Sequence, residues 1–226
     1  MKKISMFCVC CAALLSLNSC LGVQADITIR ADGSGSIALE YRVSQMLESI
    51  GRLDGNERWP AIPVGRVDFE RTAARIPGLR LSSFSTKEVR NAAGGGSDLV
   101  TKVVLEFKDT AALLAFLDSA GAHASLVQDT GKLPNAANVL RLVLLEPAAG
   151  LDQAVNNADL RSLLREISAG YEIGFSFSLP KTAVLSVIPP SVPALRTTAQ
   201  GKKVSFAIDA GELIDLEDGL AIEIVW

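Results

Sequence analysis

The sequence has no cysteine after position 20 and only one histidine, His123, among its 226 residues. The other cysteines, Cys8, Cys10 and Cys11, all precede that position. The part of the chain beyond residue 20 therefore cannot form an internal disulfide, and its stability must come from packing. A zinc site built from several histidines or free thiols is excluded there as well.

Basic runs and basic-aromatic stripes are also missing after the first residues, which argues against a nucleic-acid partner. The formal net charge is −3. Without Lys2 and Lys3, 20 basic residues face 25 acidic ones, a net charge of −5. Because 49% of the residues are hydrophobic and 21% charged, the chain can fill a core.

Residues 1–19 have the order of a secretory signal peptide: Lys2 and Lys3, the apolar stretch Ile4–Leu17, then small polar residues. The apolar stretch is too short for a transmembrane helix, which needs roughly 20 residues. We expect the signal to be removed before Cys20. The alternative is an ordinary signal peptide with a chance cysteine near its cleavage site.

Leu17-Asn18-Ser19-Cys20 resembles the lipobox of bacterial lipoproteins, although Asn18 departs from the usual small or hydroxyl residue. The resemblance implies that Cys20 carries a diacylglyceryl group and an amide-linked acyl chain such as palmitate. Two or more chains give durable membrane anchoring. Leu21 stands where an aspartate can act as an inner-membrane retention signal, which favours an outer-membrane anchor facing the periplasm.

Alternating apolar residues predict a β-hairpin starting near Asp26 and ending at Val43, around the Asp32–Gly35 turn. A second hairpin is expected over 79–107, with its tip at 91–97. Helices are expected over 44–50, over 67–76 and after an Asp109 or Thr110 cap, with an irregular stretch at 51–65.

In the second half, strands are expected over 122–128 and 138–145, and the latter is too apolar to have a solvated face. Leu160, Leu163, Leu164 and Ile167 predict an amphipathic helix. Further strands are expected over 171–179, 183–188, 204–208 and 221–226. The sum is an α+β domain over 20–226, mainly of antiparallel hairpins with three or four packed helices. A subdivision near residue 150 stays open.

The motifs tested for chemistry predict no catalytic or metal site and no cofactor. His123 lacks a Gly-x-Ser-x-Gly elbow, and a surface or strand-edge role is expected for it. Gly94-Gly95-Gly96-Ser97 lacks the lysine of a phosphate loop. The acidic residues Asp209, Glu212, Asp215, Glu217 and Asp218 do not follow the order of a calcium-binding loop and are expected to form a charged loop. Trp59-Pro60 is expected to pack on the core, with a cavity cover or a membrane contact as alternatives.

Beyond the lipobox, the layout resembles uncharacterised bacterial lipoproteins, including those of spirochaetes. More loosely, over residues 24–190, it resembles the LppM-like family of unknown function. The likeness rests on the early hairpin that begins Ile27-Thr28-Ile29-Arg30, on Ile76-Pro77-Gly78-Leu79 and on Leu179-Pro180. It implies an α/β fold with lipid-binding character.

From these observations we expect a non-enzymatic envelope module that holds a lipid or another apolar ligand between its sheet and helices. The alternative is a protein-interaction subunit that docks an envelope partner through a strand edge or the Trp59 loop. A hydrolase that uses scattered carboxylates is a third hypothesis.

Overall fold

The computed structural model describes residues 21–44, 65–90, 97–119, 124–129, 137–145, 171–214, 216 and 219–226. Several features expected from the sequence lie outside these residues: the signal peptide with Cys20, most of the helix over 44–50, the Trp59 segment, His123 and the helix over 160–167.

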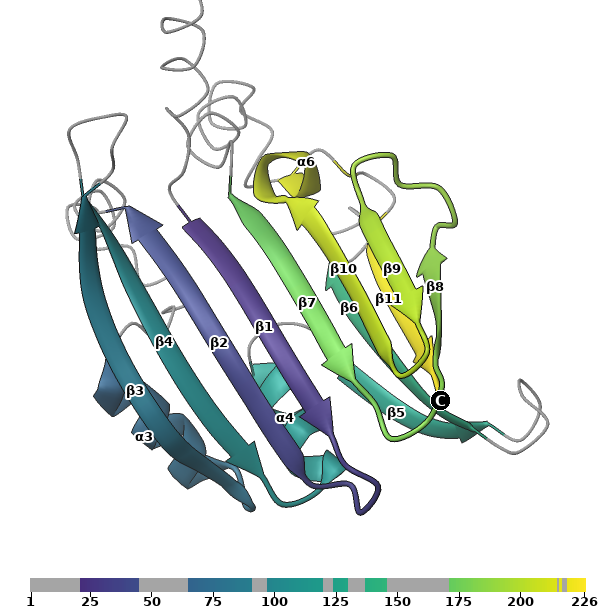
Figure 1. Ribbon diagram of the computed structural model, residues 1–226, viewed down its shortest axis with the longest axis horizontal. Coiled ribbons are helices and arrows are strands. Elements are labelled where there is room, and N and C mark those ends of the chain that lie inside the picture. Colours follow the sequence, from purple (N-terminus) through teal and green to yellow (C-terminus); the bar gives the residue numbers. More distant parts are fainter. Residues whose placement is uncertain are drawn as a thin grey trace, which may run out of the picture.

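Seven strands form the larger sheet (Figure 1). Their order is β3 (Leu79–Arg90), β4 (Ser97–Phe107), β2 (Gly35–Ser44), β1 (Leu21–Ile29), β7 (Glu172–Ser178), β10 (Lys203–Asp209) and β9 (Arg196–Gln200). All neighbours are antiparallel except β1 and β7, which run parallel. The first strand begins at Leu21, so the expected start near Asp26 was too late. Strand β9 was not predicted.

The smaller sheet has four antiparallel strands. Their order is β5 (Ala124–Asp129), β6 (Ala137–Leu145), β11 (Leu220–Val225) and β8 (Val184–Ile188). The last two strands of this sheet follow residue 180 in the sequence, whereas the other two precede residue 146. The prediction of mainly antiparallel strands is confirmed in both sheets.

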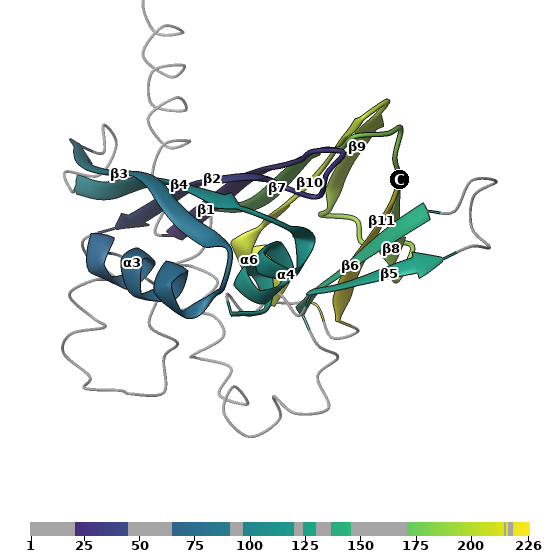
Figure 2. The same cartoon turned by 90° about the horizontal axis from the view of Figure 1, so that it is seen from below.

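Three helices are present in the described part of the chain: α3 (Arg66–Arg75), α4 (Thr110–Ser119) and α6 (Ala210–Ile214). Figure 2 shows α3 and α4 on the same face of the seven-stranded sheet. The expectation of three or four packed helices was overstated, because α6 is little more than one turn. The predicted cap of α4 is confirmed, since the Ala112 amide donates to Asp109 Oδ1 at 2.9 Å.

One continuous hydrophobic cluster contains side chains from both sheets and from α3 and α4. Ile27 and Leu105 of the larger sheet, Leu142 and Ile224 of the smaller sheet, and Leu113 of α4 are all almost completely buried. Alternate residues of each strand join this cluster because successive side chains of a strand point to opposite faces. Each sheet therefore also has an outer face, directed away from the cluster.

Candidate functional site

The outer face of the four-stranded sheet carries β-branched residues in register. Val127 of β5 pairs with Val139 of β6, which pairs with Val225 of β11, which in turn pairs with Val184 of β8. Val143, four residues after Val139 in β6, pairs with Ala221 of β11, and Ala221 pairs with Ile188 of β8. We call these seven residues the valine face: Val127, Val139, Val143, Val184, Ile188, Ala221 and Val225.

The valine face leaves large apolar side chains in solvent. Among the described residues, four large hydrophobic side chains are exposed, and three of them belong to this face: Val127 at 59%, Val184 at 49% and Ile188 at 39%. The fourth, Val67, lies on α3. Single exposed apolar residues are common on proteins, but exposed apolar residues grouped on one sheet face mark an interaction surface.

A polar row crosses the valine face between its two apolar rows. It consists of residues in register on the four strands: Ser125, Arg141, Glu223 and Ser186. Arg141 Nη1 lies 3.6 Å from Glu223 Oε1, so the two charges in this row are paired. The face thus has exposed apolar side chains on its two edge strands, almost inaccessible ones at its centre (Val139, Ala221 and Val225), and one ion pair between the two apolar rows.

The valine face spans about 14 Å from β5 to β8, at roughly 4.8 Å per strand, and a similar length along the strands. This area is smaller than the roughly 800 Å² that each partner buries in a standard interface. The valine face is therefore large enough for the apolar centre of an interface, with neighbouring polar residues as its rim.

The sequence held one signal of this surface. Residues 138–145 were predicted to have no solvated face, and Arg141, with a side chain 48% exposed, is the one exposed residue of β6 among those with a described side chain. The sequence analysis proposed docking through a strand edge without naming a strand; in the four-stranded sheet the edge strands are β5 and β8, which carry Val127 and Val184. The combination of the four strands into one apolar face could not be read from the individual segments.

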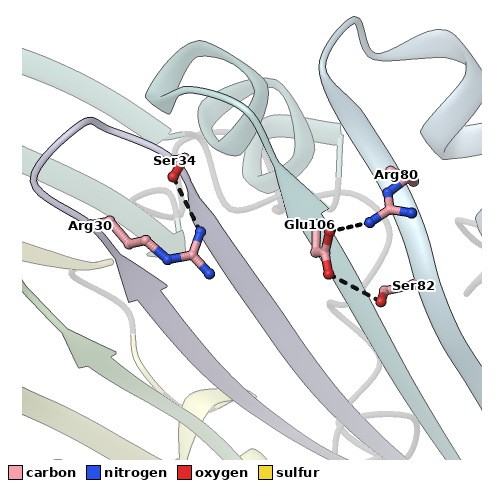
Figure 3. Close-up of polar contacts among 5 residues, drawn as sticks. All are labelled: Arg30, Ser34, Arg80, Ser82 and Glu106. Carbon is pink, nitrogen blue, oxygen red and sulfur yellow. Dashed lines mark hydrogen bonds and ion pairs between the residues drawn. The ribbon is translucent and has the colours of Figure 1, made fainter.

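The outer face of the seven-stranded sheet is different, because ion pairs cross it from strand to strand. Figure 3 shows one cluster, in which Glu106 of β4 accepts hydrogen bonds from Arg80 Nη2 at 2.5 Å and Ser82 Oγ at 3.2 Å. The hydrogen bond from Arg80 is the main reason that the pKa of Glu106 is lowered. Nearby, Arg30 donates to Ser34 Oγ at 3.2 Å.

Other charges on this sheet are paired in the same way. Lys102 Nζ lies 2.8 Å from Glu40 Oε2, and Arg196 pairs with Glu172. Arg42 Nε lies 4.0 Å from Asp98 Oδ2, and Asp98 is only 6% exposed. Burial raises the pKa of Asp98 despite the opposing effect of Arg42. Exposed cross-strand pairs contribute little to stability, so this face is best described as a solvated sheet surface.

Among the described residues, two buried hydroxyl groups have no hydrogen-bond partner: Thr101 Oγ1 in β4 and Tyr171 Oη just before β7. Thr101 pairs in register with Tyr41 of β2, and burial raises the pKa of Tyr41 to about 12. Buried polar groups are usually satisfied, so unpartnered ones call for a further donor or acceptor. Thr101 shares the inward parity of Val103 and Leu105 in β4, whereas a Cβ on Gly22 would meet the Tyr171 ring at 3.2 Å and Arg42 Cβ at 3.9 Å, so Tyr171 lies toward the outer face.

Of the acidic residues expected to form a charged loop, Asp215, Glu217 and Asp218 lie outside the described residues, as does the Gly94–Ser97 motif up to Gly96. Asp209 Oδ1 accepts a hydrogen bond from the Gly211 amide at 2.8 Å, at the start of α6. In the described part of the chain, no three His, Cys, Asp or Glu side chains are grouped to hold a metal ion. The described helices include none that is both long and apolar enough to cross a membrane.

No protein-family model matches the sequence, and a comparison with curated proteins finds no match. Among solved structures, the chain is similar to the NMR structure of the folded domain of LppM from Mycobacterium tuberculosis. The two share 14% sequence identity, and the alignment covers 90% of this chain and 88% of that chain, with a TM-score of 0.43.

Proposed function

We propose that this chain is a lipid-anchored, non-enzymatic binding module of the bacterial cell envelope, and that it binds a partner protein through the valine face. The observation that carries the binding role is the grouping of Val127, Val184 and Ile188 in solvent beside the buried pair Val139 and Val225. The continuous core, which contains side chains of both sheets, favours this role over ligand storage.

The anchor is proposed from the sequence around Cys20. Strand β1 begins at Leu21, the next residue, so a lipid on Cys20 would be attached to the sheet without a linker. We propose an outer-membrane anchor facing the periplasm, because Leu21 lacks the charge of a retention signal.

Metabolic labelling with an alkyne analogue of palmitate tests the anchor. The full chain should carry the label and sediment with membranes, and Cys20→Ser should lose both properties. Cys11→Ser is the matched control, since it removes a thiol of the signal peptide and should leave the label in place. Equal labelling of the Cys20→Ser variant would refute lipidation at this residue. Separation of inner and outer membranes by density would then test the location.

In vivo photo-crosslinking tests the binding surface. A photoreactive amino acid at Val127 or Val184 should give a discrete adduct with an envelope protein. The same amino acid at Val67 should not, although Val67 is 55% exposed and chemically identical. The adduct formed at Val184 should disappear when Val127→Asp is added, because a charge on the apolar row must be desolvated on binding. Adducts of equal yield at all three positions would argue against a specific surface.

A second candidate function is the binding of a lipid or another apolar ligand between the seven-stranded sheet and the helices. The unpartnered hydroxyl of Thr101 favours it, because ligand sites combine apolar walls with a few polar groups. Native mass spectrometry of residues 21–226 tests it. A reproducible extra mass, released by organic solvent and reduced by Thr101→Val, would support a bound ligand. A protein mass without addition would argue against it.

A further inference from the structure

Basic side chains gather at one end of the seven-stranded sheet. Strands β1, β4 and β7 end there and β10 begins there, whereas β1 starts at the opposite end with Leu21 (Figure 1). Two loops at this end are held together by backbone hydrogen bonds. The Leu179 amide donates to the Lys202 carbonyl at 2.8 Å, and the Ala183 amide donates to the Gly201 carbonyl at 2.9 Å. Lys181, Lys202 and Lys203 are therefore close neighbours.

The charge at this end has the opposite sign to that of the chain. Three further basic residues lie in the adjoining segments: Arg30 after β1, Arg80 in β3 and Lys108 after β4. The acidic residues of the same segments are Asp32, Glu106 and Asp109. Six basic against three acidic side chains give a net charge of +3, whereas the full chain carries −3.

The acidic residues at this end have partners, whereas the lysines form no ion pair with any acidic residue that the structure describes. Glu106 binds Arg80, Asp32 accepts a hydrogen bond from Ser34, and Asp109 caps α4. Within the described residues, no ion pair joins Lys108, Lys181, Lys202 or Lys203 to an acidic side chain. At the opposite end of the sheet the arrangement differs, because Arg42 and Arg196 are paired with Asp98 and Glu172.

We infer that this basic edge, formed by Arg30, Lys108, Lys181, Lys202 and Lys203, binds a linear polyanion that carries repeated phosphate groups. The five side chains extend across strands β4, β2, β1, β7 and β10, a distance of about 19 Å at roughly 4.8 Å per strand. An elongated row of exposed cations fits a charged polymer, since exposed lysines act as point charges and not as a pocket. Mutual repulsion among the lysines is relieved when the polymer binds.

The orientation agrees with such a partner. The basic edge lies at the end of the sheet opposite Leu21. In a domain anchored to the membrane through Cys20, it would therefore point away from the membrane surface. The orientation rests on the proposed anchor, whereas the charge of the basic edge does not, and the basic edge is formed by a different sheet from the valine face.

Binding of long-chain inorganic polyphosphate to the full chain in a non-ionic detergent tests the inference. At about 50 mM salt the chain should bind fluorescent polyphosphate, and binding should weaken steeply as salt rises, because binding releases counterions. The triple variant Lys181→Gln, Lys202→Gln, Lys203→Gln should bind about tenfold more weakly, with a flatter salt dependence. The control variant Lys87→Gln, Arg71→Gln, Arg90→Gln removes the same charge from exposed positions elsewhere and should stay within about twofold.

Three results would overturn the inference. The first is no binding of polyphosphate by the unmodified chain at low salt. The second is equal weakening in both triple variants, which would indicate a response to net charge alone. The third is equally effective competition by monophosphate or by a short-chain phosphatidylglycerol at the same phosphate concentration, which would indicate a site for a single phosphate. Circular dichroism of both variants checks that each is folded.

Discussion

Val139 and Val225 lie directly opposite one another in β6 and β11 and form a small hydrophobic cluster that is separate from the main core. They are 7% and 6% exposed, whereas Val127 and Val184, at the two ends of the same row, are about half exposed. The two central residues of this row are thus buried, although they do not belong to the main hydrophobic core. Mutations of the buried central pair and of the exposed end residues should therefore have different effects on stability.

Val225→Ala should lower the free energy of unfolding by about 2 kcal/mol, because two buried methyl groups are lost and a void remains. Val127→Ala removes the same groups from a mostly exposed position and should change the free energy by no more than about 0.5 kcal/mol. Urea denaturation of the two variants measures the difference. Equal losses would mean that Val127 is also buried in solution, as it would be in an oligomer.

Gly35→Ala should severely destabilise the protein. A Cβ at this position would lie 1.8 Å from the Thr28 carbonyl oxygen and 2.4 Å from the ring of Phe107, which is itself buried. Neither group can withdraw freely, so we expect a loss of about 3 kcal/mol or more.

Gly201→Ala is the control for this substitution. No atom lies within 4 Å of its added Cβ, and only the positive φ of 60° opposes alanine, at a cost of about 1–2 kcal/mol. Thermal unfolding compares the two variants. A Gly35→Ala protein as stable as Gly201→Ala would show that the close approach of β1, β2 and β4 is wrong.

Asp98→Asn should raise the melting temperature at neutral pH. Burial raises the folded-state pKa of Asp98 above its usual value of 3.8, so the folded protein loses stability as pH rises through that raised pKa. Asparagine cannot ionise and avoids this loss. The advantage should disappear below about pH 3.8, where Asp98 is protonated in both folded and unfolded chains.

Melting curves between acidic and neutral pH test the effect of Asp98. Asp26→Asn, on the same sheet but exposed, removes an equal charge and should have little effect. A less stable Asp98→Asn protein at neutral pH would mean that the attraction of Arg42 outweighs the burial of Asp98.

Arg80→Gln should raise the pKa of Glu106 toward its ordinary value of 4.5, because the hydrogen bond from Arg80 is the largest cause of the lowering. Ser82→Ala should raise this pKa less. A lowered folded-state pKa adds stability above pH 4.5 that is lost as pH falls, and this acid sensitivity should diminish in the Arg80→Gln protein. Carbon-13 NMR of the carboxyl group follows the titration. An unchanged pKa in Arg80→Gln would contradict the contact shown in Figure 3.

Local sequence patterns were sufficient to predict the hairpins and helices whose contacts are mainly with neighbouring segments of the sequence. The hairpins β1–β2 and β3–β4 follow from apolar alternation around turns, and α3 and α4 follow from helical spacing with end signals. Strand β9 was missed because Arg196–Gln200 is exposed throughout and has no apolar alternation. The start of β1 was placed too late, because Leu21–Ala25 contains a glycine and is completed by pairing with β7.

Contacts between segments far apart in the sequence could not be predicted from local sequence patterns. Val23 pairs with Ile173, and Val127 shares a row with Val184 and Val225, although nothing near these residues specifies the partner. The apolar character of residues 138–145 indicated a strand without a solvated face. Which other strands would complete that face depends on sheet order and register, which are set by packing of the whole domain.

The position of β1 has a mechanical consequence for a chain tethered at Cys20. Along β1, residues 21–29 pair with β2 and residues 23–28 pair with β7, so β1 has a hydrogen-bonded neighbour on both sides. A pull applied to its first residue acts along the strand axis. It must shear both ladders at once, whereas an edge strand pulled across its ladder unzips one bond at a time. With the proposed tether at Cys20, the fold would be attached through a strand that is paired on both sides, whereas a tether at the edge strand β9 or β8 would load a single ladder.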